Sequence, residues 1–268
     1  MTTGALIFAF DNEQTDYVTM AQWSARNIRR HLNIPTAIVT DVDTTDPRVD
    51  GFDQIITAQP ATGGTRWFED YQATVSWHNA GRTEAYDLSP WDQTLVLDAD
   101  YVVASDQLKT LLNSNQDFLA HACAYDITGV NYFTDLNEYG EYRMPMSWAT
   151  VMMFRRCEHS ELIFDCMKMI KNNWRHYKNL YQIASSTYRN DHALSIALNI
   201  VNGQTLKYQS IPWDLASLTP EHTVTKTSED CYRIDYMDRD NRARWITLHN
   251  QDFHAMGKRH LEKIIETH

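Results

Sequence analysis

Two aspartates separated by one residue follow a run of apolar residues at positions 95–100, Leu-Val-Leu-Asp-Ala-Asp. Such a run is typical of a strand covered on both faces, so Asp98 and Asp100 are expected at the carboxyl end of a buried strand, where open α/β sheets bind ligands. Two carboxylates this close repel each other unless a cation neutralises them. The spacing indicates a divalent metal site. The alternative is a pair of solvated loop aspartates, because a bare Asp-x-Asp is common.

Length and composition favour one compact domain over residues 1–268. The chain has 43% hydrophobic residues, a net charge of -11 and a pI near 5.4. An acidic protein offers no general electrostatic surface for nucleic acid, although a local basic site is still compatible with this charge. No Cys-x-x-Cys pair is present, which indicates reduced thiols in a cytoplasmic protein. The apolar N-terminal run, residues 5–10, is too short for a membrane span.

The order of apolar patterns predicts an α/β fold with a mixed, mostly parallel sheet flanked by helices. Strands are expected at 5–10, 36–40, 54–57, 95–100, 118–124, 149–155 and 244–248. Helices are expected at 19–32, 71–86, 106–112, 158–174 and 191–200. Residues 125–146 are aromatic and polar without a clear period, and a segment of that length is usually functional or orders on a ligand.

Two enzyme classes are considered first, one for the Asp-x-Asp pattern and one for a glycine-rich segment. In a haloacid-dehalogenase-type phosphatase, the motif normally lies on the first strand and is followed by Thr, whereas Tyr101 follows Asp100 here. A sugar-nucleotide pyrophosphorylase is suggested by Gly63-Gly64-Thr65-Arg66, but such a phosphate loop should follow a strand near the N-terminus. We interpret that segment as a flexible surface turn.

Several separated motifs resemble the GT-A glycosyltransferases of the glycogenin and lipopolysaccharide galactosyltransferase type. They run in the family's order: Phe8-Ala9-Phe10-Asp11-Asn12 with Tyr17, Leu-Val-Leu-Asp-Ala-Asp-Tyr-Val-Val at 95–103, the strand at 146–154, Arg189-Asn190-Asp191-His192, and His254-Ala255-Met256-Gly257-Lys258. The strand at 146–154 lacks the family's Asn and Gly, and Lys258 follows Gly257 directly. The resemblance implies a GT-A, Rossmann-like fold.

The resemblance also implies roles for individual residues. Asp98, Asp100 and His254 would bind a metal, with His249 as a rival for the histidine, and the nitrogen ligand favours Mn²⁺ over Mg²⁺. Asp191 would act at the reacting sugar. The implied contacts to the nucleotide sugar are Phe8, Ala9, Asp11, Asn12, Tyr17, Arg82, Asp98, Ala99, Ser147, Ala149, Gly257 and Lys258.

The predicted function is transfer of a hexose or pentose from a nucleoside diphosphate sugar, UDP-linked, to an acceptor hydroxyl. The resemblance implies retention of anomeric configuration, whereas the residues themselves allow Asp191 to be a general base or a polar contact. The acceptor is a glycan or another hydroxyl compound, and a modified nucleic-acid base is an option. Residues 168–181, rich in lysine and aromatic residues, are either a solvated helix face or an acceptor surface. A non-catalytic nucleotide-sugar-binding protein or scaffold of the same fold is the alternative function.

Overall fold

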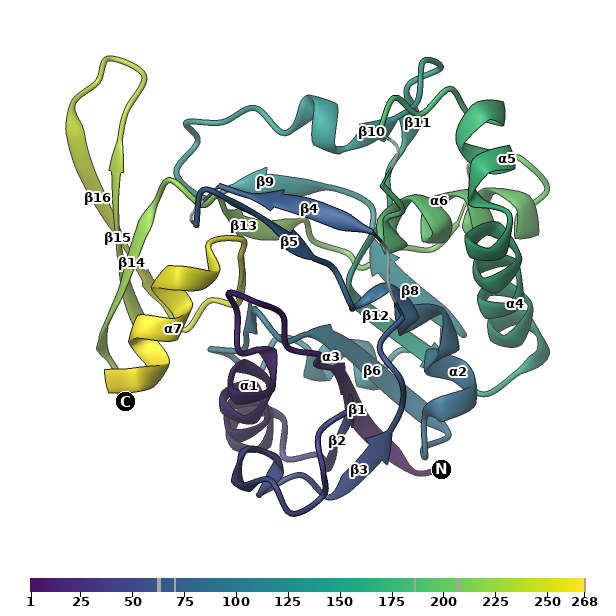
Figure 1. Cartoon of the computed structure of the whole chain (residues 1–268), viewed down its shortest axis with the longest axis horizontal. Helices are drawn as coiled ribbons and strands as arrows, with labels where there is room; N and C mark the ends of the chain where they lie inside the picture. The colour runs from purple at the N-terminus through teal and green to yellow at the C-terminus, as the bar shows by residue number, and fades with distance from the viewer. Residues whose placement is uncertain (62–63, 70, 186, 206–207, 268) are drawn as a thin grey trace.

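The computed structural model describes residues 1–61, 64–69, 71–185, 187–205 and 208–267 (Figure 1). Its centre is a six-stranded sheet in the order β3-β2-β1-β6-β12-β8. The first four of these strands run parallel, and β12 is antiparallel to both of its neighbours. The strands are β1 (Thr3–Phe8), β2 (Thr36–Thr40), β3 (Gln54–Thr57), β6 (Gln93–Asp98), β8 (Phe118–His121) and β12 (Trp148–Arg155). The mixed, mostly parallel sheet predicted from the sequence is confirmed.

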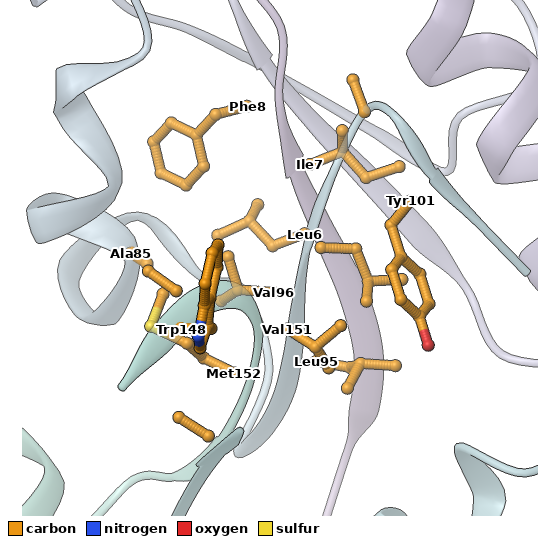
Figure 2. Close-up of a cluster of buried hydrophobic side chains, with 14 of the residues drawn as sticks. Leu6, Ile7, Phe8, Ala85, Leu95, Val96, Tyr101, Trp148, Val151 and Met152 are labelled. Atoms are coloured by element: carbon orange, nitrogen blue, oxygen red, sulfur yellow. The ribbon is translucent and has the colours of Figure 1, made fainter. Parts of the chain in front are cut away.

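Helices cover both faces of this sheet. α1 (Tyr17–Leu32) packs on β1 and β2, while α6 (Asn190–Val201) packs on β12 and against α4 (Glu158–Asn172) (Figure 1). Figure 2 shows Leu6, Phe8 and Val96 on the same side of the sheet as Trp148, with Ile7 and Tyr101 on the other side. Successive strand residues point to opposite faces, and both faces are covered, so every residue of β6 is buried. This explains the uninterrupted apolar run before Asp98.

A second sheet returns the C-terminal segment to the end of β6. It has the order β7-β17-β13-β9, with β7 (Tyr101–Val102), β17 (Phe253–Ala255), β13 (Leu215–Leu218) and β9 (Ala124–Asp126). β17 is antiparallel to β7, with His254 opposite Tyr101, and α7 (Lys258–Thr267) begins shortly after it. Residues far apart in the sequence therefore meet beside the Asp-x-Asp motif.

The C-terminal region also contains strands that the sequence did not predict. β14 (Thr223–Ser228), β15 (Cys231–Met237) and β16 (Ala243–His249) form an antiparallel sheet that extends away from the central sheet (Figure 1). Only β16 was expected, as a strand at 244–248. Three other short helices are η1 (Pro47–Val49), α3 (Lys109–Leu112) and α5 (Trp174–Leu180). Segment 125–146 contains η3 (Thr134–Leu136) and the short strands β10 (Glu138–Tyr139) and β11 (Met144–Pro145). No helix in these described ranges has both the length and the apolar character needed to cross a bilayer.

The predicted helix over 71–86 is wrong. The structure has a hairpin of β4 (Thr65–Phe68) and β5 (Ala73–Ser76), followed by η2 (Ala80–Glu84) and α2 (Ala85–Leu88). Gln72 has a φ of 50°, a left-handed conformation that ends a helix and closes the hairpin turn. Helical character therefore begins only at Ala80.

Gly4 lies where β1 passes the ring of Trp91, and an added Cβ would overlap that ring. We expect Gly4→Ala to lower the free energy of unfolding by about 1–3 kcal/mol, because overpacking forces the ring or the strand to move. Gly81→Ala is the matched control, since its Cβ would meet Ala61 at an ordinary 3.6 Å. Urea denaturation measures both. Equal stability of the two variants would show that Trp91 can move without cost.

Candidate active site and metal centre

A cavity of about 550 Å³ lies at the carboxyl ends of β1 and β6. Phe8 and Asp98, the last residues of these strands, are register partners, and both line the cavity. Ala99 and Asp100 continue the wall. The Asp-x-Asp motif thus lies at the edge of the sheet that the sequence analysis predicted.

Three side chains in this cavity form a candidate metal centre. Ligand atoms of Asp98, Asp100 and His254 lie within 4.8 Å of one another, and all three residues are buried. His254 is placed by the pairing of β17 with β7, and the next residue fixes the strand, since the Ala255 N–H donates to the Asp100 carbonyl at 3.0 Å. His254 Nε2 lies 3.3 Å from Asp100 Oδ2, and its buried Nδ1 has no hydrogen-bond partner among the described residues.

This donor set fits a hard or intermediate divalent cation. Two carboxylates and one imidazole are ligands that Mg²⁺ and Mn²⁺ accept, and the cavity leaves room for further oxygen ligands from a substrate. His249 lies elsewhere, on β16, with Nε2 at 4.0 Å from Cys231 Sγ. The structure therefore groups His254, not His249, with the two aspartates.

Each aspartate of the pair also contacts a basic side chain. Arg82, from η2, forms an ion pair with Asp98, and Lys258, the first residue of α7, forms one with Asp100. Burial alone would raise the pKa of the Asp100 carboxyl, but Lys258 and His254 hold it below its usual range. Both aspartates are thus neutralised by cations from other elements.

Asp191 also lines the cavity, in the first turn of α6. Its Oδ1 accepts the Ala149 N–H at 2.9 Å, and its Oδ2 accepts from Arg189 Nη2 at 2.7 Å. Burial would raise the pKa of this carboxyl, but Arg189 and the Ala149 N–H hold it well below the usual range. The Ala149 carbonyl accepts from Arg82 Nη1 at 3.2 Å. One backbone unit of β12 therefore orients both Asp191 and Arg82.

The residues expected at the nucleotide base separate into two groups. Tyr17, at the start of α1, lines the cavity together with Phe8. Asp11 accepts the Val18 N–H at 3.1 Å and pairs with Arg48 at 2.7 Å, and Asn12 accepts the Thr15 N–H at 2.9 Å. Ala9, Asp11 and Asn12 are outside the cavity lining in the described part of the chain, and the two polar residues shape the loop that leads into α1.

Three other expected contacts also lie behind the cavity wall. Ser147 Oγ donates to the Tyr208 hydroxyl at 2.9 Å, and Ala149 takes part through its backbone. Gly257 packs closely on Pro220, whose Cα would be 3.2 Å from an added Cβ. Trp148, the neighbour of Ser147, does line the cavity although it is only 2% exposed.

The sequence analysis missed part of the wall, contributed mainly by the β4–β5 hairpin. Arg66 and Trp67 lie on β4, and Trp77 directly follows β5. We interpreted Thr65 and Arg66 as part of a surface turn, and Gly63 of that motif lies outside the described residues. The signal was the β-branched and aromatic residues on both sides of positions 69–72, which is typical of a short hairpin.

The candidate acceptor regions are placed away from this wall. In the described chain, no residue of the basic segment 168–181 lines the cavity; Lys168 pairs with Asp87 at 2.7 Å. Trp174 packs behind the wall, edge-on to Tyr188 at 5.5 Å between ring centroids. Segment 125–146 lines a separate cavity of about 650 Å³. A role for either region in acceptor binding stays a prediction.

Comparisons with known proteins give distant similarities. No family model and no curated protein matches the chain. The glycosyltransferase GlyE of Streptococcus pneumoniae is similar with a TM-score of 0.44 and 14% identity, covering 79% of this chain and 46% of that one. For the galactosyltransferase LgtC in complex with donor and acceptor sugar analogs, the TM-score is 0.45 and the identity is 12%, and the match covers 73% of this chain and 70% of that one. For the bifunctional IspDF of Campylobacter jejuni, the TM-score is 0.41 and the identity is 9%, and the match covers 80% of this chain and 50% of that one.

This chain spans about half the length of GlyE and of IspDF. At these identities the function has to rest on the site itself.

Lys258 and a divalent cation would compete for the same oxygen of Asp100. We expect Lys258→Met to bind Mn²⁺ about tenfold more tightly than the wild type in the absence of nucleotide, because the ion no longer has to displace the ammonium group. Titration calorimetry measures this, with Lys263→Met, an exposed lysine of the same helix, as control.

Lys258→Met leaves Asp100 without its lysine partner and should lower stability, so the change in Tm on adding Mn²⁺ is a second measurement. Mn²⁺ should raise the Tm of Lys258→Met more than that of the wild type, since binding to the folded state stabilises it. Equal Mn²⁺ affinity of Lys258→Met and the wild type would show that the lysine does not occupy the metal position.

Proposed function

We propose that the protein is a metal-dependent glycosyltransferase, with residues 1–268 acting as one domain, that moves a hexose or pentose from a UDP-linked sugar to an acceptor hydroxyl. The observation that carries this proposal is the content of one cavity. Asp98, Asp100 and His254 converge in this cavity, Arg82 and Lys258 pair with the two aspartates, and the fixed carboxylate of Asp191 lines the same cavity. Transfer from a nucleoside diphosphate sugar requires a cation and positive side chains at the phosphates and a polar group at the sugar.

Asp98, Asp100 and His254 would hold the cation, and Mn²⁺ suits a set that includes a nitrogen ligand. When bound, the ion would neutralise part of the diphosphate charge and stabilise the leaving group as a Lewis acid. The same ion would release Lys258 and Arg82 from the aspartates that they neutralise. These two cations are then free to bind phosphate oxygens.

Lys258 and Arg82 are well placed to stabilise the leaving nucleoside diphosphate. As the bond between the sugar and the β-phosphate breaks, negative charge develops on the phosphate oxygens. Fixed cations in a partly dry cavity stabilise such charge more than water does, because they need not reorganise during the reaction. Arg82 also donates to the Ala149 carbonyl, and this hydrogen bond would keep its guanidinium group oriented after Asp98 has bound the ion.

The environment of Asp191 supports retention of anomeric configuration. A general base works best with a pKa near the working pH, whereas Arg189 and the Ala149 N–H hold the pKa of Asp191 far lower. A carboxylate of this kind is a weak base but a strong electrostatic partner for positive charge on a sugar ring. We therefore assign Asp191 to stabilising the sugar during transfer rather than to taking the acceptor proton.

The nucleotide site can be tested by titration calorimetry of UDP with Mn²⁺ and with EDTA. We expect binding only with the metal, and a loss of at least about tenfold in affinity for Asp100→Asn, because the site loses a charged ligand. Asp106→Asn, an exposed aspartate that is 76% accessible, is the control. If UDP, GDP, ADP, CDP and dTDP all fail to bind, the proposed function is wrong.

The role of Asp191 can be tested without knowing the acceptor. Slow transfer to water releases the sugar, and NMR identifies the first anomer formed; we expect the anomer of the donor. Asp191→Asn should lower kcat by about 100-fold with little change in KM, because its carboxylate acts mainly in the transition state. An inverted first anomer would instead identify Asp191 as a general base.

A further inference from the structure

Arg66 is a cation in the cavity wall that the proposed chemistry does not use. It lies on β4, its guanidinium carbon is 3.5 Å from the centroid of the Trp77 ring, and its Nη2 donates to the Tyr188 carbonyl at 3.2 Å. Burial lowers its pKa to about 9, and nearby Arg189 adds to this effect. At neutral pH the side chain is still charged. A charged group in this position is costly unless an anion compensates it.

The three aspartates of the cavity are already matched with other cations. Asp98 pairs with Arg82, Asp100 with Lys258, and Asp191 with Arg189. Arg66 forms no ion pair with any described carboxylate, although exposed Glu69 also lines the cavity. The described part of the site therefore holds one more cation than its three matched pairs require.

Binding of a nucleoside diphosphate that carries an uncharged sugar would not remove this excess positive charge. The two charges of a divalent ion would balance Asp98 and Asp100. Each phosphate of a sugar nucleotide carries a negative charge, and the two phosphates would balance the released Lys258 and Arg82. Arg189 and Asp191 stay matched. Arg66 is then the cation for which neither the described carboxylates nor the two phosphates of the nucleotide supply a partner.

Resting on the proposed function, we propose that Arg66 binds a carboxylate carried by a sugar substrate, so that the enzyme acts on an acidic sugar such as a uronic acid. The guanidinium fork matches a carboxylate in two parallel hydrogen bonds, and its face is already fixed on Trp77. The charged groups that act on Arg66 most strongly are Arg189 and Asp191, at the sugar end of the cavity. This end is where a carboxylate on the transferred sugar or on the acceptor sugar would lie.

The adjacent aromatic residues suit the same ligand. Trp67, on the same strand, lines the cavity and is 59% exposed, which leaves its ring free to stack on a sugar. Trp148 also lines the cavity. Aromatic faces bind the apolar side of a pyranose ring, while Arg66 would bind its charged edge.

The test compares binding of UDP, UDP-glucose and UDP-glucuronate, each with Mn²⁺, by titration calorimetry. The wild type should bind UDP-glucuronate about tenfold or more tightly than UDP-glucose, and Arg66→Gln should abolish this difference while leaving UDP affinity unchanged. Arg66→Lys should keep part of the preference, because the charge remains but the fork is lost. Arg242→Gln, an arginine 65% exposed outside the cavity lining, is the control.

A second arm identifies the source of the carboxylate. If the acceptor carries it, the UDP-saturated protein should bind methyl glucuronide more tightly than methyl glucoside, again only with Arg66 present. The inference is wrong if the wild type binds UDP-glucuronate no more tightly than UDP-glucose and methyl glucuronide no more tightly than methyl glucoside.

Two further outcomes separate this inference from the proposed function. Equal weakening of UDP and both sugar nucleotides by Arg66→Gln would make Arg66 a diphosphate contact, which overturns the inference and leaves the function intact. Failure of every nucleoside diphosphate to bind would overturn the function itself. If another nucleotide binds in place of UDP, its acidic and neutral sugars replace the UDP-linked pair.

Discussion

Two buried carboxylates at the end of the central strand β6 constrain much of the structure around the site. A buried charge has to be paired, because its desolvation costs several kcal/mol when no partner is present. Asp98 and Asp100 obtain their partners from three different elements: Arg82 from η2, His254 from β17 and Lys258 from α7. The return of the C-terminal segment to the first half of the chain is thus coupled to the charges of the Asp-x-Asp motif.

The antiparallel direction of β12 has a similar role at the same edge of the sheet. Parallel strands bring their carboxyl ends to one edge of a sheet, and an antiparallel neighbour brings its amino end to that same edge. The first residues of β12 therefore lie beside Asp98. Ala149 uses its N–H for Asp191 and its carbonyl for Arg82, so a single residue of β12 fixes the positions of both side chains.

Local patterns in the sequence were sufficient for the elements with a strong period or a continuous apolar run. β6, α1, β12 and α6 were predicted, and so was the position of the Asp-x-Asp motif at the ligand-binding edge. The choice between His254 and His249 was not possible from sequence, because it depends on the non-local pairing of β17 with β7. Likewise Asp11 and Asn12 are near the cavity in the chain, but their side chains are used in local hydrogen bonds.

The β4–β5 hairpin was missed for a different reason. Its strands have four residues each, and short segments of this kind are decided by the surface on which they pack rather than by their own propensity. The hairpin packs across the cavity, with Arg66 on Trp77 and bonded to the Tyr188 carbonyl. Sequence periodicity does not predict a cavity wall formed by such a short segment. The unmatched charge of Arg66 therefore became apparent only in the structure.

The charges of the cavity bear on how an acidic chain could bind the proposed anionic substrate. The net charge of the chain is -11, so its overall field would repel a nucleoside diphosphate sugar. Within the cavity, however, four cations, Arg66, Arg82, Arg189 and Lys258, lie with three aspartates, and the fourth carboxylate of the described lining, Glu69, is exposed. Without a ligand, three of these cations neutralise the aspartates. Under the proposed function, a metal ion at the aspartates would free Lys258 and Arg82 for phosphate, so attraction of the sugar nucleotide would depend on the metal. The charge of Arg66 would be available whether or not the metal is bound.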